Sequence, residues 1–284
     1  MAVFVGLDVG GTKTIVAACN EQGKILHRTQ DATPLDLEQG LRMLHAMIKR
    51  VVKDQPIAGM GAAVGGPLDW HTGIVSPLHQ PQWREVPLKK IMEEKWNCPF
   101  FVDVDTNIAA LGEYHSTNET VRRFLYITLS TGMGGGFLLN GKIYRGLGGE
   151  HPEIGHQSIH YRCTFPERME CECGSPDCLE GLISGNAIRR IYLKSPEYLS
   201  QREWDEVAYN LGQGLRNLAA IYLPEVIILG GGVCLGGGEK LVKNASSVMA
   251  QYLHIIPVPE VRMTSLGQDT ALIGALTIAR HGMD

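Results

Sequence analysis

A glycine-rich turn between two apolar runs constrains the fold of this chain more than any other feature. The run Val3 to Leu7 leads to Asp8 and the turn Gly10-Gly11-Thr12-Lys13, and a second run, Thr14 to Cys19, follows at once. Two runs of β type around a glycine turn predict a hairpin. The spacing fits neither a Walker A loop nor a Rossmann fingerprint, because both need a helix where this chain has a strand.

The same arrangement recurs further along the chain. The apolar run Phe124 to Leu129 leads into the glycine-rich segment Ser130 to Gly136, and a strand-like run follows at Phe137. This is a weak internal repeat of structure. Converging backbone N–H groups can hold a phosphate, and glycine permits that approach. One such turn is as easily a plain tight hairpin, but two of them favour a pair of polyphosphate-binding turns. A third turn, Gly230 to Gly232, would suit close approach of a nucleotide's base or ribose, although by itself this motif is weak.

Strands and helices alternate in both halves of the chain, which predicts an α/β protein. The periodicity predicts helices over residues 37–52, 88–96, 108–115, 204–223, 240–252 and 270–281, with strands over 57–64, 100–104, 226–229 and 261–264. Residues 68–86 are rich in Pro, His and Trp and read as a long functional loop. The length of 284 residues suits two domains, and the polar stretch 116–120 is the preferred boundary.

Composition narrows the class of protein and its partners. The net charge is −4, with no long basic run, so neither nucleic acid nor an anionic membrane is the expected partner. The first residues lack a basic leader, and no apolar run reaches the ~18 residues of a membrane span, which predicts a cytoplasmic protein. In that reducing compartment the seven cysteines favour metal binding or plain burial over disulfides.

A cluster of metal-ligand residue types lies in the second half of the chain. The candidates are His156, Cys171, Cys173 and Cys178. One histidine and three thiolates make a closed tetrahedral set typical of structural zinc, with disulfide pairing or coincidence as the alternative. His160 and Cys163, in the interval before Cys171, are alternative ligands. The remaining cysteines, Cys19, Cys98 and Cys234, have apolar or strand-end neighbours and are expected to be buried.

The order of the motifs resembles that of the ROK family of sugar kinases and repressors. The motifs are DVGGTK at 8–13, GGPLDWHTGIVSP at 65–77, DVDTNIAALGE at 103–113, STGMGGG at 130–136, HPEIGH at 151–156, CECGSPDCLEG at 171–181 and ILGGGV at 228–233. Repressors of the family carry a helix-turn-helix before the first glycine turn. Only seven residues precede Asp8 here, so we expect a kinase.

The resemblance implies an α/β protein with the two-domain actin-like ATPase fold (ribonuclease H-like, hexokinase-type) and a nucleotide and sugar cleft between the domains. It implies a small domain of residues 1–117 plus 268–284 and a large domain of residues 118–267 with the zinc motif. The implied reaction is transfer of the γ-phosphoryl group of ATP to a sugar hydroxyl, with Mg²⁺ as cofactor. The 6-hydroxyl of a glucose-like substrate is the first expectation, and the resemblance also implies a homo-oligomer, either a dimer or a tetramer.

The resemblance assigns a catalytic base and a set of sugar-binding residues. A base must accept the hydroxyl proton, and Asp105 follows a strand and precedes a helix. By position alone it could equally be a helix N-cap; the family pattern favours the base, with Asn107 structural. The implied sugar ligands are Gly66, Asp105 itself, Glu153, His156 and Glu180. Without the resemblance the two glutamates read as surface charges and His156 as a core histidine. In the family this histidine holds zinc with one ring nitrogen and faces the sugar with the other.

The implied nucleotide site consists mainly of backbone groups. Asp8 would hold Mg²⁺ through water, since hard cations prefer carboxylate oxygens. Lys13 is expected only to assist. The residues implied are Asp8, Gly10, Gly11, Thr12, Lys13, Thr131, Gly132, Gly134, Gly231 and Gly232.

One departure from the family pattern bears on the substrate. ROK glucokinases usually have Asn before the catalytic Asp, and this chain has Val104, which removes a polar contact to the sugar. The DVDTN and HPE elements look closer to fructokinases, whereas CECG looks closer to glucokinases and amino-sugar kinases. Fructose, mannose, allose, N-acetylglucosamine and N-acetylmannosamine therefore stay open as substrates. A non-enzymatic sugar sensor is the alternative from another class, and an NAD(P)-dependent oxidoreductase is disfavoured because the first turn runs into a strand.

Overall fold

The computed structural model describes residues 2–117 and 121–283, and this chain divides into two units. Unit 1 consists of Met1–Asn118, Arg145–Glu150 and Asp269–Asp284. Unit 2 consists of Glu119–Tyr144 and His151–Gln268. The predicted boundary at 116–120 falls partly on residues 118–120, which lie outside the described residues.

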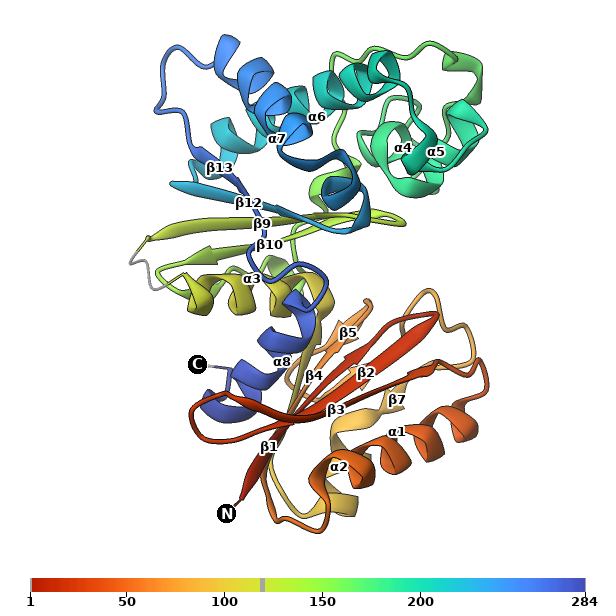
Figure 1. Ribbon diagram of the computed structural model, residues 1–284, viewed down its shortest axis with the longest axis vertical. Helices are drawn as coiled ribbons and strands as arrows, with labels where there is room; N and C mark the ends of the chain where they lie inside the picture. Colours follow the sequence, from red (N-terminus) through yellow and green to blue (C-terminus); the bar gives the residue numbers. More distant parts are fainter. Residues whose placement is uncertain (1, 118–120, 284) are drawn as a thin grey trace. The chain divides into compact units, whose positions relative to one another are not determined.

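Unit 1 is built on a five-stranded sheet with the strand order β3-β2-β1-β4-β8 (Figure 1). Its strands are β1 (Val3–Val9), β2 (Lys13–Cys19), β3 (Ile25–Ala32), β4 (Ile57–Val64) and β8 (Phe100–Val104). The first three are antiparallel neighbours, and β4 and β8 run parallel to β1. Its helices are α1 (Leu37–Val52), α2 (Leu88–Trp96), α3 (Asp105–Ser116) and α8 (Thr270–His281).

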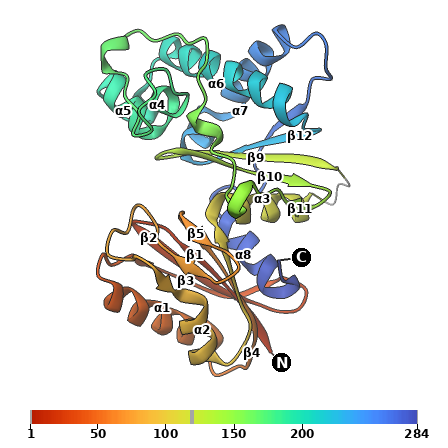
Figure 2. The ribbon, with the colours of Figure 1, turned by 180° about the vertical axis from the view of Figure 1, so that it is seen from behind.

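Helices cover both faces of this sheet, which explains why β1, β2, β4 and β8 are buried along most of their length, whereas the edge strand β3 alternates between half-buried and exposed residues. On β2, Val16 and Ala18 belong to the core that includes α1 and α2, whereas Ile15 and Ala17 pack with residues of α8 on the other face. Figure 2 shows α1 and α2 lying along one side of the sheet. Helix α8 approaches the sheet so closely that a Cβ on Gly61 would lie 2.2 Å from a backbone oxygen of the helix.

Unit 2 repeats the strand pairing of unit 1. Its sheet has the order β11-β10-β9-β12-β13, with β9, β10 and β11 antiparallel neighbours and β12 and β13 parallel to β9. The strands are β9 (Arg123–Leu129), β10 (Met133–Leu139), β11 (Lys142–Ile143), β12 (Val226–Gly230) and β13 (Glu260–Met263). The helices are α4 (Glu180–Ile183), α5 (Gly185–Tyr192), α6 (Gln201–Tyr222) and α7 (Gly232–Gln251). The repeat of structure predicted from the two glycine turns is therefore confirmed.

Some predicted segments differ from the structure, among them helix α6, which begins at Gln201 rather than at residue 204. Residues 68–86 are not only loop, because β5 (Leu68–Asp69), β6 (Ile74–Val75) and β7 (Val86–Pro87) form a small sheet whose strands are too short to show periodicity. Helix α7 begins at Gly232 rather than residue 240, since a glycine run with a non-helical Gly238 hides its first turns. Helix α3 begins at Asp105 rather than residue 108. Among the described helices, none is long and apolar enough to cross a membrane.

Candidate active site

The strand register of unit 1 brings three of the predicted site elements to one edge of the sheet. Val9 of β1 pairs with Val64 of β4, and Val64 pairs with Val104 of β8. The first glycine turn, the Gly65-Gly66 segment and Asp105 follow these three strand ends directly. In open α/β sheets, ligands bind at the carboxyl ends of parallel strands. This edge is therefore a candidate site on physical grounds.

The first glycine turn is a hairpin between β1 and β2, as predicted, and a neighbouring threonine fixes it. Gly10 N donates to Lys13 O over 3.0 Å, which closes the turn. Two hydrogen bonds from Thr33 hold the turn: its hydroxyl donates to Gly10 O over 2.7 Å and its backbone N donates to Thr12 O over 3.0 Å. A Cβ on Gly11 would lie 2.9 Å from the side chain of His79. Sequence reasoning missed Thr33 and His79, because neither lies in the motif that it supports.

The charge of Asp105 acts on the carboxyl group of Asp8. The pKa of the Asp8 carboxyl is raised to about 7, chiefly by burial and then by the charge of Asp105. Asp269 raises it less, and the charges of Lys13 and Arg28 lower it. Asp105 itself is exposed at the first position of α3, where it accepts a hydrogen bond from Thr106 N over 2.7 Å. A carboxylate that is half-buried and repelled by a second one favours a bound cation or proton.

Replacing Asp8 by Asn is expected to stabilise the protein at alkaline pH. The pKa of the folded state lies above the ordinary value of 3.8, so ionisation opposes folding. That cost is absent below pH 3.8, grows as the pH rises toward 7 and is complete above it. Asp8→Asn should raise the free energy of unfolding at pH 8 by roughly 1–3 kcal/mol. This is less than the full pKa shift would give, because Asp8 is half-buried and solvent screens part of its charge. Urea unfolding of both proteins without Mg²⁺ at pH 8 and pH 4 measures this difference. Equal free energies of unfolding for the variant and the unchanged protein at pH 8 would contradict the prediction.

A buried ion pair supports the strand that carries Asp105. Asp103 is 1% exposed and pairs with Arg145 over 2.5 Å. The Arg145 guanidinium also lies 3.9 Å from the ring centroid of Trp70, and Asn107 donates to Asp103 over 3.3 Å. Removing one partner of a buried pair leaves an uncompensated charge, so these residues hold the end of β8 and the start of α3 in place.

In unit 2 the second and third glycine turns also share a sheet edge. Gly230 of β12 pairs with Thr128 near the end of β9, so the turn after Leu129 and the Gly231-Gly232 segment are neighbours. Gly231 has φ 88°, and a Cβ there would lie 2.4 Å from Leu129 O, whereas a Cβ on Gly232 would meet nothing within 4 Å. The close approach that requires Gly231 is thus to the end of β9, and open space lies beside Gly232.

Glu180 is fixed by the second glycine turn. Met133 N donates to its Oε2 over 2.8 Å, and a Cβ on Gly132 would lie 3.2 Å from the same oxygen. Its other carboxylate oxygen lies 4.0 Å from Cys171 Sγ. Glu180 is half-buried, so it is not the solvated surface charge that the sequence allowed as an alternative.

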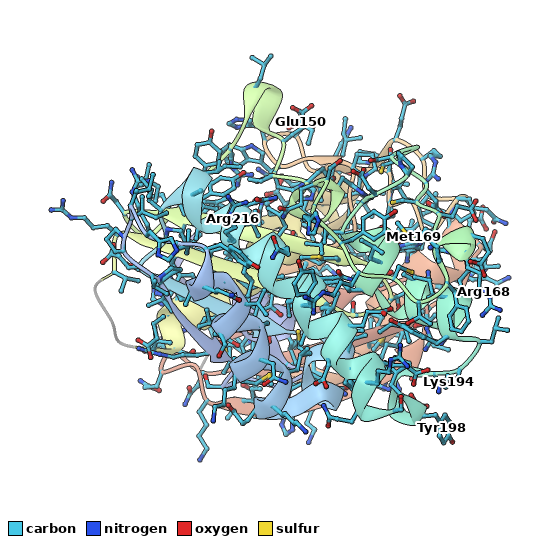
Figure 3. The ribbon with its side chains drawn as sticks, turned by 90° about the horizontal axis from the view of Figure 1, so that it is seen from above. Glu150, Arg168, Met169, Lys194, Tyr198 and Arg216 are labelled. Carbon is cyan, nitrogen blue, oxygen red and sulfur yellow. The ribbon has the colours of Figure 1, made fainter. Side chains whose placement is uncertain are left out.

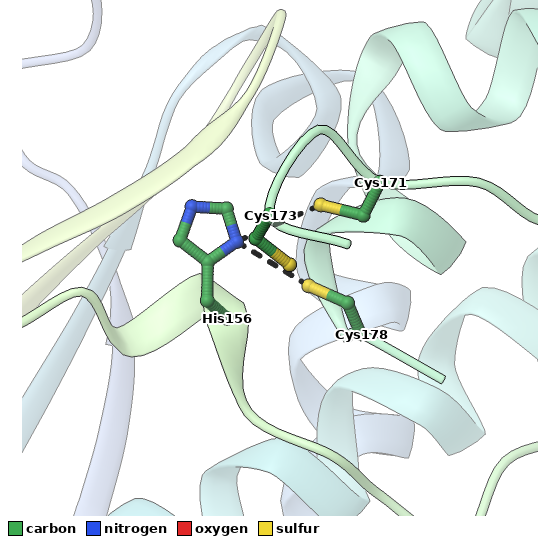
Figure 4. Close-up of side chains that lie close together, drawn as sticks. All are labelled: His156, Cys171, Cys173 and Cys178. Atoms are coloured by element: carbon green, nitrogen blue, oxygen red, sulfur yellow. Dashed lines mark hydrogen bonds between the residues drawn. The ribbon is translucent and has the colours of Figure 1, made fainter. Parts of the chain in front are cut away.

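The structure brings together the four predicted metal ligands (Figure 4). The ligand atoms of His156, Cys171, Cys173 and Cys178 all lie within 4.8 Å of one another. His156 Nδ1 is 3.4 Å from Cys178 Sγ and 3.6 Å from Cys171 Sγ. This donor set and this spacing fit a tetrahedral zinc ion. Burial raises the pKa of Cys178 to about 12, so a metal ion must displace its proton on binding.

The other ring nitrogen of His156 faces a second predicted site residue. His156 Nε2 lies 3.8 Å from Glu153 Oε2, and His151 Nε2 lies 3.5 Å from Glu153 Oε1. The Glu153 side chain is 60% exposed, so its carboxylate is open to a ligand. One imidazole therefore links the metal cluster to an accessible carboxylate.

Comparison with known proteins identifies the family. The model of the ROK family matches residues 4–281. This chain belongs to the ROK family. It is 31% identical to a glucokinase of Halalkalibacterium halodurans, over 95% of this chain and 93% of the relative. It is 26% identical to a xylose repressor of Caldicellulosiruptor bescii, over 99% of this chain and 78% of the repressor. A crystal structure of a ROK family glucokinase from Streptomyces griseus with glucose and AMPPNP is 27% identical, has a TM-score of 0.79 and covers 99% of this chain and 100% of that one.

The ROK membership confirms the predicted actin-like fold.

The segment between His156 and Cys171 is anchored on α6. Asn210 accepts a hydrogen bond from Arg162 N and donates to Arg162 O, both over 2.8 Å. His160 pairs with the hydroxyl of Tyr209 over 3.1 Å, and Cys163 packs against the core. His160 and Cys163 therefore lie outside the metal cluster, so the structure does not support them as alternative ligands.

Proposed function

We propose that this ROK protein is an ATP-dependent sugar kinase that transfers the γ-phosphoryl group of ATP to a sugar hydroxyl. The observation that carries the proposal is the placement of Asp105 beside Asp8 and the first glycine turn at one sheet edge. The S. griseus glucokinase, crystallised with glucose and AMPPNP, supports ATP and a hexose as the substrates. The 6-hydroxyl of a glucose-like sugar is the first candidate acceptor.

The chain's own residues would act by positioning and by moving one proton. Asp105, exposed at the start of α3, accepts the proton of the attacking hydroxyl. Asp8 would hold Mg²⁺ through water, and the raised pKa of its carboxyl fits a group whose charge a cation would balance. Mg²⁺ would neutralise phosphate charge as it develops. The N–H groups of Gly10, Gly11 and Thr12 hold phosphate oxygens, with Lys13 assisting. The remaining nucleotide contacts are assigned to Thr131, Gly132, Gly134, Gly231 and Gly232.

The sugar would be bound by Gly66, Glu153, His156 and Glu180. Carboxylate and imidazole groups accept and donate hydrogen bonds in pairs, which suits adjacent ring hydroxyls. Structural zinc would hold the His156 ring through Nδ1 and leave Nε2 for the sugar or for Glu153. Outer groups that orient a histidine in this way fix its tautomer.

A panel of sugars tests both the reaction and the substrate. Val104 is a buried valine where ROK glucokinases usually have Asn, so selectivity against the epimers of glucose is expected to be weaker than an Asn would give. Sugar-dependent ADP release should be measured with glucose, fructose, mannose, allose, N-acetylglucosamine and N-acetylmannosamine. We expect at least one sugar to support turnover. Val104→Asn is expected to shift the preference toward glucose, and an unchanged ranking would contradict this role for residue 104.

The non-enzymatic alternative is a sugar-sensing regulatory protein. The similarity to a xylose repressor favours it, and the intact first glycine turn and Asp105 speak against it. Sugar binding without sugar-dependent ADP release from any member of the panel would select the sensor. A dimer or tetramer, implied by the family resemblance, stays a prediction.

A further inference from the structure

The loop that carries the cysteine ligands is closed at its base by an arginine outside the metal cluster. We name residues 170–181 the zinc loop, since Glu170 precedes Cys171 and Gly181 follows Glu180. Arg190 Nη2 donates to Glu170 O and, over 3.0 Å, to Gly181 O. Arg190 Nε donates to Arg168 O over 2.9 Å. One guanidinium thus binds the backbone at both ends of the zinc loop and on the segment that leads into it, where Figure 3 labels Arg168 and Met169.

The two ends of the zinc loop are closely packed against one another. A Cβ on Gly181 would lie 2.7 Å from Glu170 O and 3.1 Å from Cys171 Cβ. The two ends of the zinc loop are therefore in direct contact, and Gly181 permits that contact because it has no side chain. A planar guanidinium has five N–H donors in a fixed fork, so it can bind several carbonyls at once, which an ammonium cannot do with the same geometry.

The helix that carries Arg190 is itself firmly anchored. On α5, Ala187, Ile188 and Ile191 are at most 1% exposed and belong to the core of unit 2. Ser184 caps the helix and accepts a hydrogen bond from Ala187 N over 3.1 Å. Ile191 O in turn accepts a hydrogen bond from Arg168 over 2.8 Å. Arg190 therefore reaches the loop from a rigid element, as a residue that positions other groups should.

We infer that Arg190 is a positioning residue that closes the zinc loop without help from the metal. The loop supplies Cys171, Cys173 and Cys178, and it ends next to Glu180. If its base is held shut by Arg190, the three thiols stay near His156 before zinc binds, and less ordering accompanies binding. The consequence is slow release of zinc, because its bonds to the three thiolates must break while the closed base of the loop keeps the thiolates close to the ion. The role of Glu180 toward the sugar rests on the proposed function, whereas the effect on zinc does not.

Zinc release to a colorimetric chelator tests this inference in the absence of any sugar or nucleotide. Purified zinc-loaded Arg190→Met is expected to release zinc about tenfold to a hundredfold faster than the unchanged protein, by analogy with the loss of metal affinity when a residue that orients a metal ligand is removed. Arg190→Lys should fall between the two, because an ammonium reaches fewer of the carbonyls. Arg189→Met, on the exposed face of the same helix, is the matched control and should release zinc at the unchanged rate.

Each result decides the inference. An Arg190→Met protein with an unchanged melting temperature and an unchanged release rate would overturn it, and so would equal acceleration in Arg189→Met. If Arg190→Met does not fold, the release rate of Arg190→Lys decides. Protein that cannot be loaded with zinc overturns it as well. Because no substrate is present, a failure here leaves the sugar kinase proposal standing, and a failure of the ADP-release panel leaves this result standing.

Discussion

Asp105→Asn is expected to lower kcat by about a hundredfold to ten-thousandfold, the range that general-base catalysis contributes. The amide has nearly the shape of the carboxylate but cannot accept the hydroxyl proton. The side chain is exposed at the start of α3 and accepts a hydrogen bond from Thr106 N, which an amide oxygen can also accept. Folding and KM for the sugar should therefore change little, so that the loss falls on kcat. Steady-state ADP release on the best sugar of the panel measures both constants.

A matched control separates loss of the base from loss of a charge. Asp54 is exposed and has φ 66°, a left-handed backbone that Asn tolerates, so Asp54→Asn removes a surface carboxylate of unit 1 at little cost. Its kcat should equal that of the unchanged protein. If Asp105→Asn kept full activity, Asp105 would not be the base. A rise in KM with unchanged kcat would instead make it a sugar ligand.

The parts of the site that were predictable from sequence are those written as local motifs. A glycine turn between two β runs had to be a hairpin, and a carboxylate directly after a strand had to lie at the end of that strand. The positions of Asp8, Gly66 and Asp105 at one edge then follow from the parallel register of three strands. The same logic placed the three thiols near one another, because they are close in sequence.

The parts that were not predictable depend on contacts between distant segments. Thr33, Arg145 and Arg190 act through hydrogen bonds to groups that lie 23, 42 and 20 residues away in sequence, and no spacing rule predicts such contacts. Short strands such as β5 and β6 have only two residues each, too few for an alternating pattern. Helices α4 and α5 follow the cysteine motif so closely that the sequence reading gave them no element at all. Tertiary packing, rather than intrinsic propensity, decides such segments.

Loss of the zinc site is expected to be the second large effect. The unchanged protein should contain about one zinc ion per chain, as the four convergent ligands imply. Cys171→Ser or Cys173→Ser should lose the zinc ion together with most of the activity, because zinc then no longer fixes the ring of His156, whose other nitrogen faces Glu153 and is proposed to face the sugar. Elemental analysis and ADP release on the same preparations measure the two losses. Active protein purified free of zinc would refute the structural role.

Cys163→Ser is the control that tests the choice of ligands. Cys163 is half-buried, lies in the interval before Cys171 and packs against the core of unit 2 outside the cluster. The Cys163→Ser protein should keep zinc and activity, and loss of zinc there would mean that Cys163 is a ligand after all.

The affinity for zinc is expected to depend on pH in one direction. Because the pKa of Cys178 is raised to about 12 without metal, zinc binding must release its proton, so zinc affinity should fall as the pH is lowered. A zinc content that stays constant between mildly alkaline and mildly acidic buffers containing a competing chelator would argue that thiolates do not hold the ion.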